Sequence, residues 1–369
     1  MKIAQVAPLF ESVPPKTYGG TERVVHFLTE ELIRQGHEVV LYASADSRTS
    51  AELRPVVPQS LRLSGQAQDN FTGQLLQLAA VARAAHSFDV IHFHTDFLHF
   101  PLCRHIAVPQ VSTMHGRLDL PELKMIFAEF SDMPVISISN DQRRPLPGAR
   151  WSSTVYNGMP EQLYDFQPQQ GKYLAFLGRI SPEKGPEEAI NIALRTGLPL
   201  RMAAKVDAAD REYFEQRIRP LLREPNIEFL GEIDDRGKNE LLGGALALLF
   251  PVSWPEPFGL AMVEALACGT PVIAYQRGSV PEVMLHGHTG YIVDNQDQAV
   301  SALSDIERID RRACRRHFEE NFSARKMADG YLAAYRLLIE GSAANSSSAS
   351  PEWNRTSHAA ITAAGASRA

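Results

Sequence analysis

Short apolar runs alternate with amphipathic stretches along most of the chain. In the first half, six runs have the length and composition of buried strands: KIAQVAP (2–8), EVVLYAS (38–44), DVIHFHT (89–95), PQVSTMHG (109–116), PVISIS (134–139) and STVYNG (153–158). Amphipathic segments such as TERVVHFLTEELIRQG (21–36) separate them. Strands that alternate with helices in this way are typical of a parallel sheet with helices on both faces.

A second series of runs follows a polar connector, GMPEQLYDFQPQQGK (158–172). Its members are KYLAFLGR (172–179), LPLRMAAK (198–205), IEFLGEI (227–233), ALALLFPV (245–252) and TPVIAY (270–275). Each series is about long enough for one doubly wound domain, so we predict an α/β protein with two Rossmann-like domains, residues 1–160 and 170–322. Such sheets bind ligands beyond the carboxyl ends of their strands, and two of these edges that face each other leave a cleft.

Composition and charge narrow the class of protein. The 369 residues exceed what one hydrophobic core usually organises, and a net charge of −6 argues against a nucleic-acid partner. The three cysteines lack the paired spacing of a zinc site or a disulfide framework. No signal peptide or membrane span is recognised, so we expect a soluble cytoplasmic protein. The Ser- and Ala-rich segment 341–369 is predicted to be disordered.

Two loops that follow strands carry residues suited to binding an anion. Gly19 and Gly20 stand just before a helix, where backbone N–H groups can approach an anion closely, although most Gly-Gly turns simply start a helix. Arg179 and Lys184 lie on the connection after the first strand of the second series, close to the start of the next helix. An arginine fork and a lysine charge beside a helix N-terminus suit a diphosphate; the alternative is that both are solvated loop charges.

The stretch SWPEPFGLAMVEALACGTPVIAY (253–275) predicts a turn, a helix that begins near Phe258, and a buried strand. Glu256 stands just before this helix, and Glu264 lies well inside it, away from the apolar stripe that faces the sheet. Eight residue steps of helix rise about 12 Å, which is comparable to the distance between the two ends of a nucleotide sugar. Two carboxylates so placed could accept hydrogen bonds from both ends of one extended ligand. The alternative is that Glu256 is a helix N-terminal charge and Glu264 faces solvent.

EPFGLAMVE (256–264) resembles the paired-glutamate motif of the retaining glycosyltransferases of family 4, which have the two-Rossmann-domain GT-B fold. The resemblance extends from KIAQVAP (2–8) through FSARKMADGYLAAY (322–335). It also includes the Gly19-Gly20 loop, STMHG with His115, SISNDQRR, GRISPEKG and ACGTPVIAYQRGSVPEVMLHGHTGYIV. These segments occur together in the order that the family has, which makes the resemblance specific.

The resemblance implies roles for the charged residues. In similar enzymes the residues that match Arg179 and Lys184 bind the donor diphosphate. The glutamate that matches Glu264 holds the ribose hydroxyls, and the one that matches Glu256 contacts hydroxyls of the donor sugar. Glu256 is therefore not expected to act as a nucleophile.

Other roles implied by the resemblance concern the backbone and the facing domain. Backbone amides of Phe258, Gly259 and Leu260 reach the sugar and the phosphates. The histidine that matches His115 lies across the cleft, near the sugar C6 hydroxyl and the reacting centre. The loop with Gly19 and Gly20 closes over the phosphates and the acceptor.

We therefore predict a hexosyltransferase that uses a nucleotide-diphosphate sugar, with UDP-glucose as the first guess, and a glycan, lipid-linked or small-molecule hydroxyl acceptor. The chain has no Asp-x-Asp motif, so Arg179, Lys184 and a helix N-terminus are expected to stabilise the leaving diphosphate without a metal or other cofactor. In similar enzymes the leaving phosphate oxygen deprotonates the acceptor, and retention of configuration is expected. The alternatives are a GT-B-like epimerase or phosphorylase, and a non-catalytic nucleotide-sugar-binding protein.

Three further segments complete the prediction. His92, His94, Asp96 and His99 lie close together and could suggest a metal site, but the run matches a strand end of the family and no metal is expected. The run RRACRRHF (311–318) is basic enough to contact an anionic membrane surface if its arginines share one helix face; a solvated helix is the alternative. The resemblance implies that a last helix, residues 323–340, crosses back to the first domain.

Overall fold

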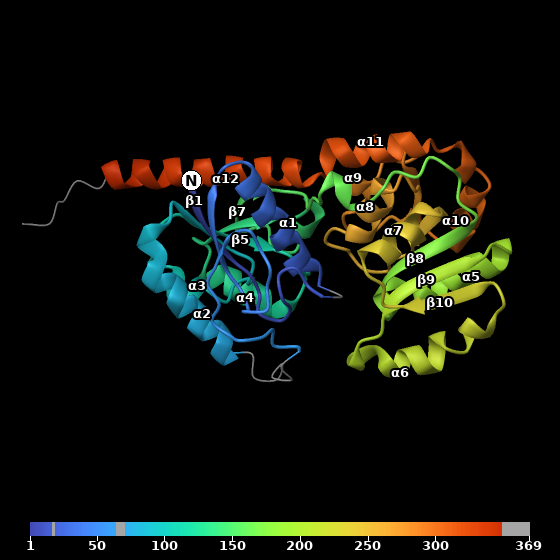
Figure 1. The fold of residues 1–369 in the computed structure, drawn as a ribbon, viewed down its shortest axis with the longest axis horizontal. Coiled ribbons are helices and arrows are strands. Elements are labelled where there is room, and N and C mark those ends of the chain that lie inside the picture. The colour runs from blue at the N-terminus through green and yellow to red at the C-terminus, as the bar shows by residue number, and fades with distance from the viewer. Residues whose placement is uncertain (17–18, 64–70, 349–369) are drawn as a thin grey trace, which may run out of the picture.

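The computed structural model describes residues 1–16, 19–63 and 71–348 of the chain. Its strands form two sheets in two lobes that lie side by side along the long axis of the molecule (Figure 1). The first sheet has seven strands in the order β3-β2-β1-β4-β5-β6-β7, and the second has six in the order β10-β9-β8-β11-β12-β13. All neighbouring strands pair in parallel, as the alternation of strands and helices predicts.

The central strands are buried along nearly their whole length because helices cover both faces of each sheet. The strands are β1 Lys2–Val6, β2 Glu38–Tyr42, β3 Glu52–Leu53, β4 Val90–Phe93, β5 Gln110–Met114, β6 Pro134–Ser137, β7 Arg150–Thr154, β8 Tyr173–Arg179, β9 Leu200–Lys205, β10 Ile227–Gly231, β11 Ala245–Phe250, β12 Val272–Tyr275 and β13 Gly290–Val293. The helices are α1 Gly20–Arg34, α2 Phe71–Ala84, α3 Phe100–Cys103, α4 Pro121–Glu129, α5 Pro186–Thr196, α6 Arg211–Tyr213, α7 Asp235–Gly243, α8 Leu260–Ala267, α9 Val280–Val283, α10 Gln296–Leu303, α11 Arg311–Asn321 and α12 Ala324–Ser348.

The strands that differ from the sequence prediction all lie at sheet edges. β7 covers Arg150–Thr154, whereas the apolar run lies at 153–158, and β3 and β13 have no predicted counterpart. β3 pairs only two residues, which is too short for a clear apolar pattern, and the two middle residues of β13 are only partly buried. β7 is partly exposed, so its sequence RWSST carries few apolar residues.

α12 leaves the second lobe and runs along the first (Figure 1). It packs against α1, and its residues Tyr331 and Tyr335 are fully buried. The helix continues to Ser348, whereas the composition predicts disorder from residue 341. The segment 341–348 contains no proline, and extending an existing helix costs far less than nucleating one. Residues 349–369 of the predicted tail lie outside the described residues.

The chain passes between the lobes twice, and the two passages lie side by side. Met159, in the connector after β7, donates its backbone N–H to the carbonyl of Phe322 at 3.0 Å. The carbonyl of Met159 accepts from the N–H of Ala324 at 2.8 Å. A Cβ on neighbouring Gly158 would lie 2.3 Å from the carbonyl oxygen of Ser323, so no larger residue fits there. Backbone hydrogen bonds therefore join the two passages at one point.

The basic run 311–318 lies within α11, and its arginines do not share one face. Arg311 is buried and donates to the hydroxyl of Thr270 and to the carbonyl oxygens of Gln167, Gly243 and Ala245. Arg315 donates to the carbonyl oxygens of Glu161, Tyr164 and Ala267. Only Arg312 and Arg316 are exposed. Both sequence interpretations of this run are therefore wrong for Arg311 and Arg315, because these side chains bind backbone carbonyls inside the lobe.

Across the described ranges, none of the helices combines the length and the apolar character needed to cross a bilayer.

Candidate active site

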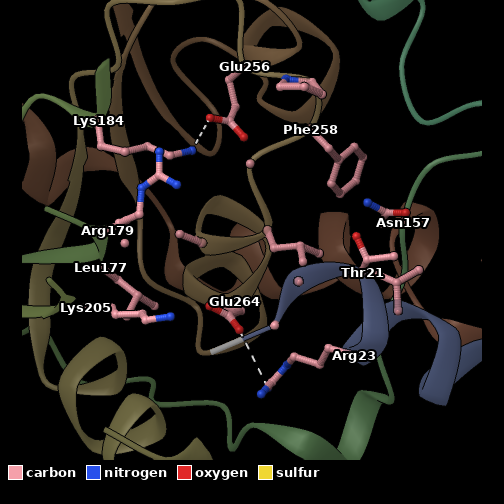
Figure 2. A pocket seen from close by; sticks show the side chains of 18 of the residues that line it. Thr21, Arg23, Asn157, Leu177, Arg179, Lys184, Lys205, Glu256, Phe258 and Glu264 are labelled. Atoms are coloured by element: carbon pink, nitrogen blue, oxygen red, sulfur yellow. Dashed lines mark hydrogen bonds and ion pairs between the residues drawn. The ribbon is translucent and has the colours of Figure 1, made fainter. Parts of the chain in front are cut away.

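A cavity of about 410 Å³ lies between the carboxyl ends of the two sheets. All ten residues predicted for the donor and catalytic site line it: Gly19, Gly20 and His115 from the first lobe, and Arg179, Lys184, Glu256, Phe258, Gly259, Leu260 and Glu264 from the second. Figure 2 shows the second-lobe side chains facing one space, with Glu256 and Glu264 well apart and Arg179 and Lys184 along one flank. The fold thus brings together residues that lie as far as 245 positions apart, from Gly19 to Glu264.

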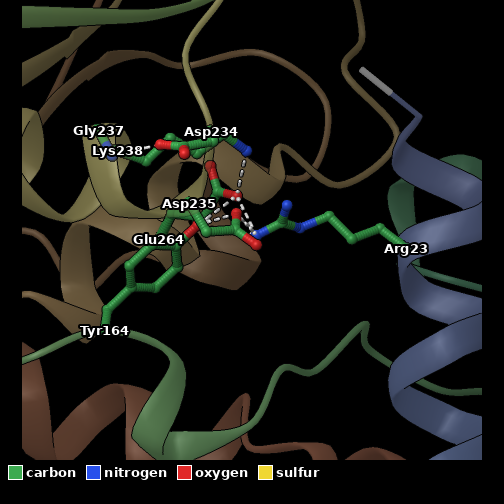
Figure 3. A network of polar contacts seen from close by, with 7 residues as sticks. All are labelled: Arg23, Tyr164, Asp234, Asp235, Gly237, Lys238 and Glu264. Carbon is green, nitrogen blue, oxygen red and sulfur yellow. Dashed lines mark hydrogen bonds and ion pairs between the residues drawn. The ribbon is translucent and has the colours of Figure 1, made fainter. Parts of the chain in front are cut away.

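Glu264 is the most buried carboxylate of the cavity, 4% exposed. Its Oε1 atom accepts from Lys238 Nζ at 2.9 Å and from the Tyr164 hydroxyl at 3.1 Å, and it lies 3.6 Å from Arg23 Nη2 (Figure 3). Burial opposes ionisation, but Lys238 and Arg23 hold the pKa of Glu264 below its usual value. No described residue hydrogen-bonds Oε2, so this oxygen is available to a ligand in the cavity. The interpretation of Glu264 as a solvent-facing residue is wrong.

Arg23 reaches the second lobe from the first turns of α1. Besides approaching Glu264, it forms an ion pair with Asp235 at the start of α7 and donates to the Tyr164 hydroxyl at 2.9 Å (Figure 3). The carboxylates of Glu264 and Asp235 raise the pKa of Arg23 against the effect of its burial. One face of the cavity is therefore completed by a cation from the opposite lobe.

At the other end of the cavity, the cations are paired with carboxylates. The Lys184 ammonium bonds the Glu256 carboxylate (Figure 2), and its Nζ lies 5.0 Å from the centre of the Trp254 ring. Arg179 bonds Glu183, and its Nε lies 3.5 Å from Asp210 Oδ2. A bound anion would compete with these carboxylates for the same two cations.

The helix that carries Glu264 begins two residues later than predicted. α8 starts at Leu260, so Phe258 lies in the loop before it, and Glu256 is not separated from Glu264 by eight helical steps. The expectation of a 12 Å helical rise between the two carboxylates is therefore wrong in its geometry. The helix starts late because Gly259, its N-cap, has a left-handed backbone with a φ of 79° and therefore ends the loop. A Cβ there would lie 2.7 Å from Met262 Cε and 2.9 Å from Phe250 Cζ.

The N-terminus of α8 lacks a side-chain cap. Its first residues, Leu260 and Ala261, line the cavity. Uncapped N–H groups and the positive end of the helix dipole favour an anion at this position. The cavity therefore offers an anion two kinds of positive group: side-chain cations and the N-terminus of α8.

The first lobe contributes its glycine loop and His115. Gly19 is the N-cap of α1, and a Cβ on it would lie 2.7 Å from Pro15 Cβ, so the loop packs tightly at this point. His115 directly follows β5, and its Nε2 lies 2.9 Å from His94 Nδ1. Burial lowers the pKa of His115 to about 3, so the ring is neutral. A neutral imidazole can offer either a lone pair or an N–H to a ligand.

The sequence prediction missed several residues of the cavity. Among them are Thr21, Arg23, Asn157, Lys205, Glu232, Lys238 and Trp254. Arg23 and Lys238 lie on amphipathic helices, where a cation usually marks a solvated face. Arg23 could have been found from its position in the first turn after the Gly19-Gly20 loop, which already pointed at the cleft.

The histidines in and after β4 form internal hydrogen bonds. His92 bonds Tyr335 and Thr113, His94 bonds Gln5 and His115, and His99 bonds Ser112. Among the described residues, no group of three or more His, Cys, Asp or Glu side chains is arranged to hold a metal ion.

Two family models match the chain in successive segments. The model described as "Glycosyltransferase Family 4" matches residues 18–156, and the model described as "Glycosyl transferases group 1" matches residues 165–323. The first segment contains most of the first sheet with His115, and the second contains the whole second sheet with Glu256 and Glu264.

Curated relatives match over most of their length. The chain is 27% identical to the glycogen synthase of Mycobacterium tuberculosis. The alignment is 388 positions long and covers 88% of this chain and 93% of that protein. It is 28% identical to the phosphatidyl-myo-inositol mannosyltransferase of Mycobacterium leprae over 341 residues, covering 83% and 86%.

Solved structures share the two-lobed arrangement. The sucrose-phosphate synthase of Thermosynechococcus elongatus matches with a TM-score of 0.76 at 19% identity, over 92% of this chain and 99% of that one. The Anabaena HepE protein in complex with UDP matches with a TM-score of 0.70 at 21% identity, over 91% and 100%. At these identities the likeness concerns the fold.

Proposed function

Because the chain belongs to the group 1 glycosyltransferases of the family 4 type and has the GT-B fold, we propose that it is a metal-independent, retaining hexosyltransferase. The observation that carries the proposal is one cavity with carboxylates at separate positions, two cations on its flank and an uncapped helix N-terminus. This set of groups matches the parts of a nucleotide-diphosphate sugar.

The proposed donor pose follows from the chemistry of the lining. The free Oε2 of Glu264 accepts hydrogen bonds from the ribose hydroxyls, and the diphosphate lies against Arg179, Lys184 and the first turn of α8. Glu256 receives the sugar hydroxyls once Lys184 turns to the phosphate. His115 faces the sugar from the first lobe. Each group then binds a part of the donor with complementary hydrogen-bonding capacity.

The chemical step places negative charge on the leaving diphosphate. In this pose Arg179, Lys184 and the α8 amides lie against the diphosphate where this charge develops, which lowers the barrier to breaking the sugar–phosphate bond. We propose that the leaving phosphate oxygen takes the proton of the acceptor hydroxyl, which attacks from the same face. The product of an α-linked donor is then α-linked. NMR of the product tests this, and a β-linked product would refute retention.

UDP-glucose is the first donor to try, because the fold-level neighbour HepE has been crystallised with UDP and with UDP-glucose. GDP-mannose, UDP-GlcNAc and ADP-glucose complete the panel. A ligand that binds only the folded state raises the melting temperature, so thermal shift ranks the panel. The acceptor is proposed only as a hydroxyl of a glycan, a lipid-linked carrier or a small molecule.

Release of free nucleotide from the best donor tests whether the chain is a transferase or only a binding protein. We expect slow hydrolysis by the wild type, unchanged in excess EDTA. In Lys184→Ala we expect a loss of about 10²- to 10³-fold in kcat, the usual effect of removing one group that stabilises developing charge. Arg195→Ala is the matched control, because Arg195 pairs with Asp297 on the surface and does not line the cavity. Equal rates in the two variants would contradict the proposed site.

A further inference from the structure

Seven polar side chains form one continuous hydrogen-bonded chain from α12 to the cavity. In order they are Tyr331, Thr113, His92, Tyr335, Gln5, His94 and His115. The successive distances are 3.0, 2.7, 2.6, 3.1, 2.7 and 2.9 Å. The first six side chains are at most 2% exposed, and only His115 lines the cavity. A buried polar chain of this kind is stable only where each donor meets an acceptor.

The Gln5 amide sets the direction of the chain toward the cavity. Its Nε2 donates to the Tyr335 hydroxyl, so its Oε1 faces His94 Nε2 at 2.7 Å and can only accept. His94 Nε2 must therefore carry the hydrogen. Burial lowers the pKa of His94 well below its usual value, so the ring is neutral and its Nδ1 has only a lone pair. The 2.9 Å contact between His94 Nδ1 and His115 Nε2 is then a hydrogen bond that His115 donates.

Thr113 gives the same direction from the other end. Its single hydroxyl hydrogen goes to the Tyr331 hydroxyl, so His92 Nε2 must donate to Thr113 Oγ1. Burial also lowers the pKa of His92 well below its usual value, so the ring is neutral and Nδ1 accepts from the Tyr335 hydroxyl. Tyr335 thereby donates to His92 and accepts from Gln5. The two ends of the chain agree at Tyr335 without leaving a donor unpaired between them.

We infer that His94, Gln5 and Tyr335 are positioning residues that hold His115 as the Nε2–H tautomer, so that His115 presents the lone pair of Nδ1 to the substrate. Among the described residues, none hydrogen-bonds Nδ1 of His115, and His115 lines the cavity. A lone pair selects a hydroxyl or another hydrogen-bond donor of the substrate and repels a carbonyl, carboxylate or phosphate oxygen. The inference rests on the proposed function only in taking the cavity as the place where the sugar binds.

The hydrogen-bonded series of side chains also connects the tautomer of His115 to α12, the helix that crosses between the lobes. Tyr331 and Tyr335 are one turn apart on α12, whereas the other members lie on β1, β4 and β5 or directly after them. Seating of α12 against the first sheet is therefore what completes the orientation of Gln5.

Two variants of α12 separate positioning from packing. Tyr335→Phe keeps the buried ring but leaves Gln5 Nε2 and His92 Nδ1 without a partner, so the Gln5 amide loses its fixed orientation. Tyr331→Phe removes an equally buried hydroxyl one turn away and leaves both partners of Gln5 in place. Both variants keep the buried ring; Tyr335→Phe leaves two buried polar groups without a partner, and Tyr331→Phe leaves one, the Thr113 hydroxyl.

The decisive measurement is the tautomer of His115, read by NMR of protein with ¹⁵N-labelled histidine and assigned with His115→Gln. We expect a protonated Nε2 and a bare Nδ1 in the wild type and in Tyr331→Phe, and a mixture of tautomers in Tyr335→Phe. A wild-type His115 with its hydrogen on Nδ1 would overturn the inference. So would a Tyr335→Phe spectrum identical to that of Tyr331→Phe.

Kinetics with the best donor of the panel supply the second readout. We expect Tyr335→Phe to lower kcat about 3- to 10-fold, the effect of one hydrogen bond, with the donor KM unchanged. Tyr331→Phe should keep the wild-type kcat, and equal kcat values in the two variants would refute a positioning role. Unchanged turnover in His115→Ala would refute it as well. Absence of turnover with every nucleotide sugar would refute the proposed function instead, and the NMR experiment would then decide the tautomer.

Discussion

At the scale of single residues, Glu264 shows how a buried carboxylate is kept ionised for a ligand. Lys238, Arg23 and Tyr164 all approach Oε1, so the charge is compensated on one side and exposed to the cavity on the other. An isolated buried carboxylate would become protonated and lose its strength as an acceptor. The cluster therefore prepares Oε2 to bind hydroxyl groups.

The first prediction concerns this oxygen. Glu264→Gln keeps the shape of the side chain but removes the anionic acceptor. We expect the donor KM to rise about 10- to 100-fold, the effect of losing a hydrogen bond to a charged group. Asp235→Asn is the control, because it removes the other carboxylate partner of Arg23 and leaves Glu264 intact. Calorimetric titration with the free nucleotide measures the change, and an unaltered dissociation constant in Glu264→Gln would contradict the pose.

The second prediction concerns stability against acid. Burial lowers the pKa of His92 and His94 well below the usual value and that of His99 to about 3, so the native state keeps these rings neutral while the unfolded chain protonates them below about pH 6.5. Each ring therefore lowers the free energy of unfolding by about 1.4 kcal/mol per pH unit below that value. Burial raises the pKa of Asp96 to about 6, which acts in the opposite direction.

We expect the free energy of unfolding to fall between about pH 7 and pH 5, above the range where most paired carboxylates titrate. Urea titrations at several pH values measure the slope. His99→Leu removes a ring that stacks on Phe93, 3.7 Å between centres, and lies outside the cavity. This variant should show a smaller slope than the wild type. A slope that does not change would mean that His99 is protonated in the native state.

At the scale of elements, the start of α8 depends on one glycine. Gly259 and Gly197 both have left-handed backbones, with φ of 79° and 70°. A Cβ on Gly197 meets nothing within 4 Å, whereas one on Gly259 would clash with Met262 and Phe250. We expect Gly197→Ala to cost only the backbone strain of about 1–2 kcal/mol. Gly259→Ala should cost more and also raise the donor KM, because α8 must shift. Thermal melting compares the two variants, and equal losses would exclude this explanation.

α11 gives a second prediction at this scale. Arg311→Leu leaves the buried carbonyl oxygens of Gly243 and Ala245, the part-buried one of Gln167 and the Thr270 hydroxyl without this donor. We expect a loss of about 2–4 kcal/mol of unfolding free energy. Arg312→Leu changes an exposed neighbour on the same helix and should stay within about 0.5 kcal/mol of the wild type. Urea unfolding distinguishes them. If both variants were equally stable, the hydrogen bonds from Arg311 to the carbonyl groups would make no net contribution to the free energy of unfolding.

At the scale of the whole molecule, Glu282 on α9 joins the two lobes. Its carboxylate accepts from the backbone N–H groups of Asn140 and Asp141 at 2.7 and 2.8 Å and from the Tyr156 hydroxyl at 3.0 Å. Glu282→Gln offers one oxygen instead of two, so we expect weaker contact between the lobes. Small-angle scattering should show a larger radius of gyration than in the wild type or in the exposed control Glu307→Gln. Identical scattering in all three proteins would refute a joining role.

The sequence predicts the architecture better than it predicts the site. Parallel, doubly covered sheets follow from the alternation of apolar runs and helices, because buried strands need nearly continuous apolar residues. Glu264 can be recognised in the sequence because its helix carries a carboxylate away from the apolar stripe, eight residues after Glu256. Arg23 and Lys238 were missed because their partners come from other elements, and the left-handed backbone of Gly259 was missed because nothing local distinguishes this residue from a helical start. Non-local pairing of this kind has no signature in the order of residues.

The joined backbone at Met159 and Ala324 limits how the lobes can move. Because the two backbone passages lie together at this point, we expect any opening of the lobes to be a rotation about it rather than a slide or a separation. In such a rotation, residues far from this point move furthest, and residues beside it keep their neighbours. We therefore expect the cavity between the lobes to widen for a substrate while the two backbone passages stay hydrogen-bonded to each other.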